Sequence, residues 1–93
     1  MSNTYKIYLI SDSTGETLDR IFLALKAQFK NIEYEVKPYS FTRTENQILK
    51  ILDDAKKKEN PVILYTIVDN NLAKYLANVS DKKKFLVLGC LEI

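Results

Sequence analysis

The sequence contains no histidine and only one cysteine, Cys90. Without histidine the chain lacks the commonest general base, the commonest zinc ligand and the basic partner that activates a serine or cysteine nucleophile. One cysteine cannot form an intramolecular disulfide, and without a histidine partner it is more typical of a buried or idle thiol than of a nucleophile. These absences exclude serine–histidine and cysteine–histidine catalysis.

Long apolar runs and a strong excess of one charge are also missing. No apolar segment approaches the length of about 20 residues that spans a membrane, and the first residues do not have the pattern of a signal peptide. The chain has 14 basic and 12 acidic residues and a formal net charge of +2. This balance gives no argument for nucleic acid or membrane binding. We therefore expect a cytoplasmic protein that binds neither.

The length and composition fit one small globular domain. The chain has 93 residues, of which 46% are hydrophobic, a normal fraction for a folded protein. Such a domain is stable by roughly 5–14 kcal/mol on the usual per-residue range. Because no internal repeat or linker interrupts the sequence, we predict a single domain over residues 1–93.

Four short segments have the composition of β-strands, and we predict strands at Tyr5–Ile10, Glu33–Tyr39, Pro61–Thr66 and Lys84–Leu88. Pro61–Thr66 is almost wholly apolar, which favours a central strand covered on both faces. Glu33–Tyr39 mixes apolar residues with charges and contains Pro38, which has no backbone donor. This strand is therefore expected at or near an edge of the sheet.

Helical spacing of apolar residues follows the first strand. The predicted helix runs from about Thr14 to Lys30. Ser13 and Glu16 have the spacing of a capping box, in which the two side chains bond the first free amides of a helix. We therefore expect Ser13 to cap this helix.

Two further helices are predicted between the remaining strands. Thr44 and Gln47 form a second capping box, and this helix ends in Lys56–Lys58, cations at the negative end of the helix dipole. Asp69 is placed to cap the third helix, a role more typical of this position than that of a catalytic base.

The alternation of strands and helices predicts an α/β fold. We expect a three-layer sandwich with a mainly parallel four-stranded sheet in a Rossmann-like β-α-β-α-β-α-β order. In such sheets, ligands bind beyond the carboxyl ends of the strands, where strand order reverses. The residues that this topology delivers there include Ser11–Gly15, Ser40, Thr42, Arg43, Thr66, Asp69, Gly89 and Cys90.

The stretch SDSTGET, residues 11–17, raises the question of an anion site. The free amides of a helix start favour anions, and Gly15 would let a ligand approach the backbone closely. However, the stretch matches neither G-x-G-x-x-G nor G-x-x-x-x-G-K-[ST], and Asp12 and Glu16 repel phosphate unless a metal intervenes. Helix capping and an anion contact therefore both stay open. The candidate anion contacts are Ser11, Ser13, Thr14, Gly15, Thr17 and Arg43.

Arg43 is the best single cation among these candidates. It could clamp a phosphate or carboxylate through two parallel hydrogen bonds, or it could pair with Glu45 on the surface. Asp53 and Asp54 lie within the second predicted helix, and their spacing makes no metal site. We predict no metal ligand in this sequence.

Three segments together resemble one protein family. They are IYLISDSTGETLDRI at 7–21, FTRTENQI at 41–48 and VILYTIVDNNLAKYL at 62–76. From about Tyr5 to Leu88 the chain is similar to the regulatory proteins of pyruvate, phosphate dikinase and of phosphoenolpyruvate synthetase. The S-D-S-T-G-E-T string and the step Arg43–Thr44–Glu45 are its most specific parts.

The resemblance implies a bifunctional activity. Members of this family phosphorylate a threonine on the dikinase or synthetase, with ADP as the donor, and so inactivate the enzyme. They also remove that phosphate by phosphorolysis with inorganic phosphate, which yields pyrophosphate. In agreement with their difference from ordinary protein kinases, the sequence has no H-R-D or D-F-G signature.

The sequence also departs from this family. Family chains are much longer and carry a phosphate-binding loop of the type G-x-S-R-x-x-K-[ST]-P in their second half. Nothing here matches that loop, because Gly89 is the only glycine after Gly15 and no lysine follows it. The resemblance thus predicts a truncated amino-terminal domain that holds no cofactor, with no catalytic residue to assign.

Three functions remain open at this stage. The chain could be part of a kinase and phosphorylase that acts on pyruvate, phosphate dikinase or phosphoenolpyruvate synthetase. It could instead be a non-catalytic module that forms a homodimer or docks the target enzyme, or an inactive remnant. Phosphate transfer by the isolated chain would separate the first possibility from the others.

Overall fold

Strands and helices alternate along the chain. The computed structural model describes residues 4–28, 32–82 and 86–89. The elements are β1 (Tyr5–Ser11), α1 (Glu16–Lys26), β2 (Tyr34–Tyr39), α2 (Glu45–Ala55), β3 (Pro61–Thr66), α3 (Asn70–Lys82) and β4 (Leu86–Gly89). The strands pair in parallel in the order β2-β1-β3-β4. The predicted α/β class with a parallel sheet is confirmed.

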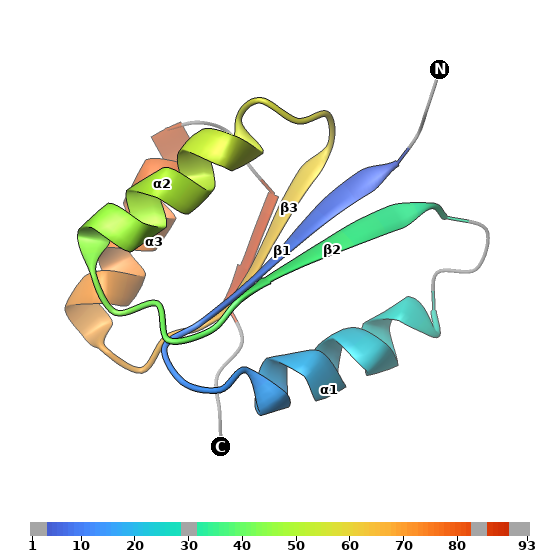
Figure 1. Cartoon of the computed structure of the whole chain (residues 1–93), viewed down its shortest axis with the longest axis horizontal. Helices are drawn as coiled ribbons and strands as arrows, with labels where there is room; N and C mark the ends of the chain where they lie inside the picture. The colour runs from blue at the N-terminus through green and yellow to red at the C-terminus, as the bar shows by residue number, and fades with distance from the viewer. Residues whose placement is uncertain (1–3, 29–31, 83–85, 90–93) are drawn as a thin grey trace.

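The helices lie on both faces of the sheet. Figure 1 shows α1 on one face and α2 with α3 on the other. The connection from β1 to β2 runs toward one edge, whereas the two later connections run toward the opposite edge. Because right-handed crossovers made in opposite directions place their helices on opposite faces, the strand order explains these layers.

Burial along the strands follows their positions in the sheet. In β3, Val62, Ile63, Leu64 and Thr66 are buried, as expected for a central strand between two layers of helices. In β2, which lies at an edge, every residue is half-buried or exposed. The predictions for both strands are confirmed, and the bounds of β3 agree with the sequence.

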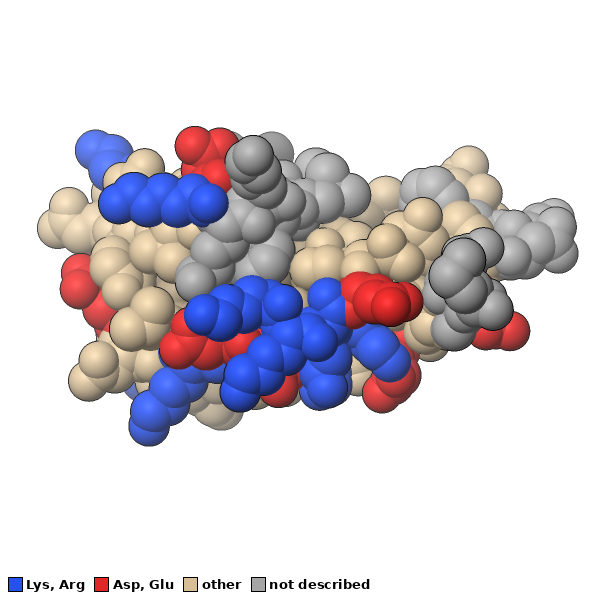
Figure 2. All heavy atoms as spheres, turned by 90° about the horizontal axis from the view of Figure 1, so that it is seen from above, with Lys and Arg blue, Asp and Glu red and all other residues tan. Residues whose placement is uncertain are grey.

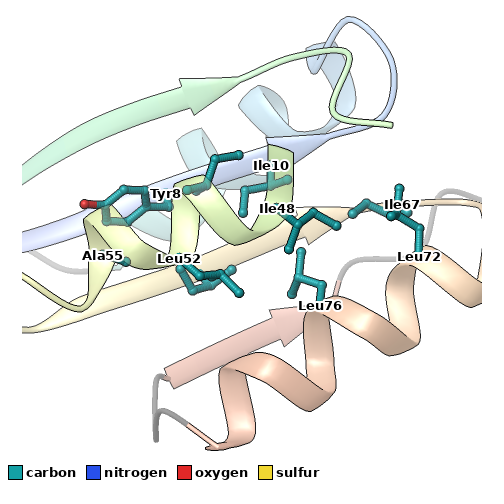
Figure 3. Packing of buried hydrophobic residues seen from close by; sticks show 10 residues of the cluster. Tyr8, Ile10, Ile48, Leu52, Ala55, Ile67, Leu72 and Leu76 are labelled. Atoms are coloured by element: carbon teal, nitrogen blue, oxygen red, sulfur yellow. The ribbon is translucent and has the colours of Figure 1, made fainter. Parts of the chain in front are cut away.

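The core has two parts, one on each face of the sheet. The larger part lies between the sheet and α2 and α3 (Figure 3). It consists of Tyr8, Ile10, Ile48, Ile51, Leu52, Ala55, Ile63, Ile67, Leu72 and Leu76. The smaller part lies beneath α1 and consists of Leu9, Leu18, Val62 and Leu64. Burial of these side chains is the main force that holds the layers together.

The start of α1 differs from the prediction. The helix begins at Glu16, and its N-cap is Gly15, which has a left-handed backbone (φ 85°) and makes no side-chain cap bond. The capping box predicted for Ser13 and Glu16 is therefore wrong. Ser13 instead donates its backbone N–H to Ser11 Oγ at 3.1 Å. Because the turn at Gly15 delays the helix, Glu16 is its first residue rather than its third.

The end of α1 also differs from the prediction, and the predicted start of β4 is not described. Helix α1 ends at Lys26, short of the predicted end at Lys30, which lies outside the described residues together with Phe29. Strand β4 spans Leu86–Gly89, and its predicted start at Lys84 lies outside the described residues. Such ends depend on weak local preferences, so shifts of a few residues are common.

The predicted caps of α2 and α3 are confirmed. Thr44 Oγ1 accepts the backbone N–H of Gln47 at 3.1 Å, and Gln47 Oε1 accepts the N–H of Thr44 at 3.0 Å. Asp69 Oδ1 accepts the N–H of Leu72 at 3.0 Å. These bonds satisfy amides that have no partner within the helix.

A polar cluster joins α2 to the sheet. Tyr8 is buried, and its hydroxyl donates to Asp54 Oδ2 at 2.7 Å, while Lys37 Nζ donates to the same oxygen at 3.2 Å. Hydrogen bonds from Tyr8 first and then from Lys37 lower the pKa of Asp54. Burial and the bond to Asp54 raise the pKa of Tyr8.

The free energy of unfolding should therefore decrease in acid. A carboxyl whose pKa is lower in the folded state stabilises the fold above its unfolded pKa of about 3.9, and this contribution is lost as the pH falls through the folded pKa. Glu35, whose pKa the hydrogen bond from Lys6 lowers, contributes to the same decrease. Asp54→Asn should make the decrease below pH 4 smaller without abolishing it. Urea titrations between pH 2 and 7 would measure this, and a curve parallel to that of the unaltered chain would contradict it.

Ser80 provides a second stability prediction. Its hydroxyl is buried on α3 and has no hydrogen-bond partner in the part of the chain that the structure describes. A buried polar atom without a partner costs about 1–3 kcal/mol, so Ser80→Ala should raise the free energy of unfolding by about 1 kcal/mol. Asn78→Ala, at an exposed position of the same helix, controls for helix propensity. A loss of stability in Ser80→Ala would show that the hydroxyl is bonded in solution.

Candidate functional site

The strand order defines a switch point beside β1. The chain leaves β1 toward α1 on one face and leaves β3 toward α3 on the other face. Ligands of open α/β sheets bind where neighbouring connections diverge in this way. The two strands end at Ser11 and Thr66, which are paired in register, with their hydroxyl oxygens 3.4 Å apart. We call residues 12–15, 40–44 and 67–69, which follow β1, β2 and β3, the carboxyl-edge loops.

Ser11 lies at the centre of this edge. It is buried, and its Oγ accepts the N–H of Ser13 and lies 3.3 Å from Ser13 Oγ. The carbonyl of Ser11 accepts the N–H of Thr42 at 2.8 Å. The side chain and carbonyl of Ser11 thus connect β1 to the two neighbouring strand ends and to its own loop.

The loop after β2 is fastened to the loop after β1. Phe41 N–H donates to the carbonyl of Ser13 at 2.9 Å, and Ser40 Oγ donates to the carbonyl of Thr14 at 3.1 Å. With the bonds from Thr42 to Ser11 and from Arg43 to Asp12, the loop after β2 makes four hydrogen bonds to the end of β1 and its loop among the described residues. The hydroxyl of Ser40 is therefore occupied by the protein itself.

Asp12 connects all three carboxyl-edge loops. Its Oδ2 accepts the N–H of Val68 at 2.9 Å, and its carbonyl accepts Nε of Arg43 at 3.1 Å. The ion pairs within the described residues are Lys6–Glu35 and Lys37–Asp54. Arg43 therefore does not make the surface pair with Glu45 that the sequence allowed, and its guanidinium is held over the loop after β1.

The structure brings the sequence-predicted site residues to one edge. Ser13, Thr14 and Arg43 are exposed there, Gly15 and Thr17 are half-buried, and Ser11 is buried. Asp12, Glu16 and Asp69 add three carboxylates, while Arg43 is the only cationic residue in segments 11–17, 40–44 and 66–70. Among the residues that the structure describes, no group of three or more cysteine or carboxylate side chains is placed to hold a metal. The edge can therefore offer one anchored guanidinium and hydroxyls in an acidic setting.

Sequence reasoning missed two apolar residues of this edge. Phe41 has a left-handed backbone (φ 54°), and its ring is exposed with the guanidinium carbon of Arg43 at 5.3 Å from the ring centroid. Val68 is also exposed. An aromatic residue between polar ones, as in Ser40–Thr44, was the available signal for Phe41, whereas nothing in the sequence marked Val68.

The opposite edge of the sheet has a mixed charge. Figure 2, viewed from above Figure 1, shows lysine and arginine side chains gathered on this side with acidic side chains among them. Lys6 pairs with Glu35, and Lys37 pairs with Asp54. Basic and acidic groups are thus interspersed on this edge.

The end of β4 and the character of the helices remain to be described. Gly89 ends β4, whereas Cys90, which was predicted beside it, lies outside the described residues. Within ranges 4–28, 32–82 and 86–89, none of the helices has the length and apolar character required to cross a lipid bilayer.

Fold and edge together define an open parallel α/β domain whose polar loops meet at a topological switch point. The chain belongs to the kinase/pyrophosphorylase family, whose model matches residues 7–93. The resemblance recognised in the sequence is therefore confirmed.

Two curated relatives illustrate this similarity. The chain is 72% identical over 94 residues to a Pelagibacter ubique (strain HTCC1062) protein, covering 98% of this chain and 34% of the relative. It is 44% identical over 79 residues to a Geotalea uraniireducens (strain Rf4) protein, covering 85% of this chain and 29% of that relative. Both are provisionally named pyruvate, phosphate dikinase regulatory protein. The chain thus spans about a third of the length of these relatives.

Proposed function

We propose that this domain takes part in the regulation of pyruvate, phosphate dikinase. The family match over residues 7–93 and the names of the relatives carry this proposal. The regulator would phosphorylate a threonine of the dikinase with ADP as the donor and remove that phosphate with inorganic phosphate, in the cytoplasm. Phosphoenolpyruvate synthetase is the alternative target.

We further propose that the groups that transfer phosphate lie outside these 93 residues. Phosphoryl transfer needs several donors around the transferred phosphate and usually a metal ion. The carboxyl-edge loops contain one arginine, which is already bonded to the carbonyl of Asp12. The role of this domain is then to dock the target or to form a dimer, and to support the part that carries out the chemistry.

An anion contact at the carboxyl edge is the competing proposal. The observation that favours it is the guanidinium of Arg43, anchored beside the exposed hydroxyls of Ser13 and Thr14. Inorganic phosphate or the phosphates of ADP would be the ligand. Against it, the hydroxyl of Ser11 is already engaged by Ser13 and Thr66, and nearby carboxylates oppose an anion.

Transfer of radioactive phosphate from labelled ADP to purified pyruvate, phosphate dikinase tests the main proposal. The full-length Pelagibacter relative should label the dikinase, and the 93-residue chain alone should not. An excess of the chain should slow labelling by the relative, because both would occupy the same docking surface on the dikinase. Labelling of the dikinase by the chain alone would contradict the proposal that the groups that transfer phosphate lie outside these 93 residues. Failure of the relative to act would remove the dikinase as the target.

A further inference from the structure

Two exposed apolar side chains of the carboxyl edge, those of Phe41 and Val68, lie near an arginine that bonds the loop after β1. Phe41 is 52% exposed and Val68 is 73% exposed, although both are apolar. The guanidinium of Arg43 lies over the ring of Phe41, and Asp12 bonds both Arg43 and the backbone of Val68. Asp12 thus links the Phe41–Arg43 pair to the neighbouring loop that carries Val68, and we call these three exposed residues the Phe41–Val68 surface.

The backbone holds the ring of Phe41 outward at an energetic cost. Its left-handed conformation (φ 54°) is unfavourable for a bulky residue by about 1–2 kcal/mol. Such a conformation persists where surrounding contacts determine it, here the bonds from the amides of Phe41 and Thr42 to the carbonyls of Ser13 and Ser11. The fold thus presents an aromatic ring that its own core does not use.

The path of the chain indicates what lies opposite this surface. Strand β4 is parallel to β3, and Gly89 is in register with Tyr65, so β4 ends at the same edge as the carboxyl-edge loops. Polypeptide that follows β4 must therefore begin at this edge. The matched segment accounts for 34% of the Pelagibacter relative, so about two-thirds of that protein lies elsewhere in its chain.

We propose that the Phe41–Val68 surface packs against the polypeptide that follows the matched segment in the relatives. Aromatic and arginine side chains are enriched at the centres of protein interfaces. A stable interface between separate proteins buries roughly 1,200–2,000 Å² in total, far more than three side chains provide. A tethered segment needs less area because its effective concentration is high, which favours it over a second copy or a free partner.

Cysteine labelling tests this inference without any measurement of phosphate transfer. Val68→Cys probes the surface, and Leu23→Cys is the matched control, because Leu23 is 55% exposed on α1, away from the edge. Each is made in the 93-residue chain with Cys90→Ser, and at the aligned positions of the full-length Pelagibacter relative after replacement of its own cysteines. The measured quantity is the rate of reaction with a maleimide reagent under native conditions.

In the full-length relative, the probe at the position of Val68 should react at least about tenfold more slowly than the probe at the position of Leu23, as expected for a covered site. In the 93-residue chain the two probes should react at similar rates. Equal rates in the relative, or protection of the Leu23 position instead, would overturn the inference. Protection of Val68→Cys that appears only at high concentration of the chain would assign the surface to a second copy. Protection that requires added dikinase would assign it to the target enzyme. Both results would also overturn the inference, while the proposed function would still stand.

Discussion

Replacement of Leu52 by alanine should lower the free energy of unfolding by about 3–4 kcal/mol. Leu52 is fully buried in the larger part of the core, where α2 packs on the sheet. Its truncation removes apolar contacts and leaves a cavity that the surrounding side chains fill only in part. Because a domain of this size is stable by roughly 5–14 kcal/mol, this single change should remove a large share of its free energy of unfolding.

Leu49→Ala is the matched control for this prediction. Leu49 lies on the same helix, and its side chain is 38% exposed, so the same chemical change should cost less than about 1 kcal/mol. Urea denaturation of both variants gives the two values from the shift in midpoint at constant slope. Equal losses for Leu49→Ala and Leu52→Ala would show that α2 does not pack as described.

Gly15→Val should lower the free energy of unfolding by about 2 kcal/mol. Gly15 has a left-handed backbone at the start of α1, a conformation that a β-branched residue adopts only with strain. A β-carbon at this position would meet Ser40 Oγ at 3.6 Å, which is an ordinary contact. The loss should therefore come from the backbone rather than from lack of space.

Gly15→Asn separates these two causes. Asparagine tolerates the left-handed region better than other residues with side chains, so this variant should lose less than about 1 kcal/mol, although its side chain is also larger than that of glycine. Thermal or urea unfolding measures both variants. If asparagine were as harmful as valine, crowding at Ser40 would be the cause and the backbone argument would be wrong.

The sequence predicted those elements that are determined mainly by burial of apolar residues or by a cap within one helical turn. Pro61–Thr66 was predicted with its observed bounds because a central strand needs apolar residues on both faces. The capping box of Thr44 formed because it requires only residues within one turn. The similar pattern at Ser13 failed because the left-handed turn at Gly15 starts the helix later and because the amide of Phe41 bonds the carbonyl of Ser13. A contact between distant loops leaves no local signature.

Topology likewise predicted which polar residues meet at the carboxyl edge, but not what they bond. Residue spacing indicated that Asp12 repels phosphate, but not that it also joins Arg43 and Val68. These bonds depend on the paths of three loops, which residue spacing alone does not determine. The left-handed backbone of Phe41 was not predicted from the sequence either, because such conformations are expected for glycine or asparagine and not for an aromatic residue.

The central claim is that the polar residues of the carboxyl edge hold its loops together, while phosphate transfer belongs to residues outside this domain. Amide proton–nitrogen NMR of the 93-residue chain, titrated with ADP and then with inorganic phosphate, tests this claim most directly. We predict a well-dispersed spectrum in which neither ligand causes saturable shifts. Saturable shifts confined to Ser11–Thr17 and Arg43 would contradict the claim and establish an anion site at the switch point.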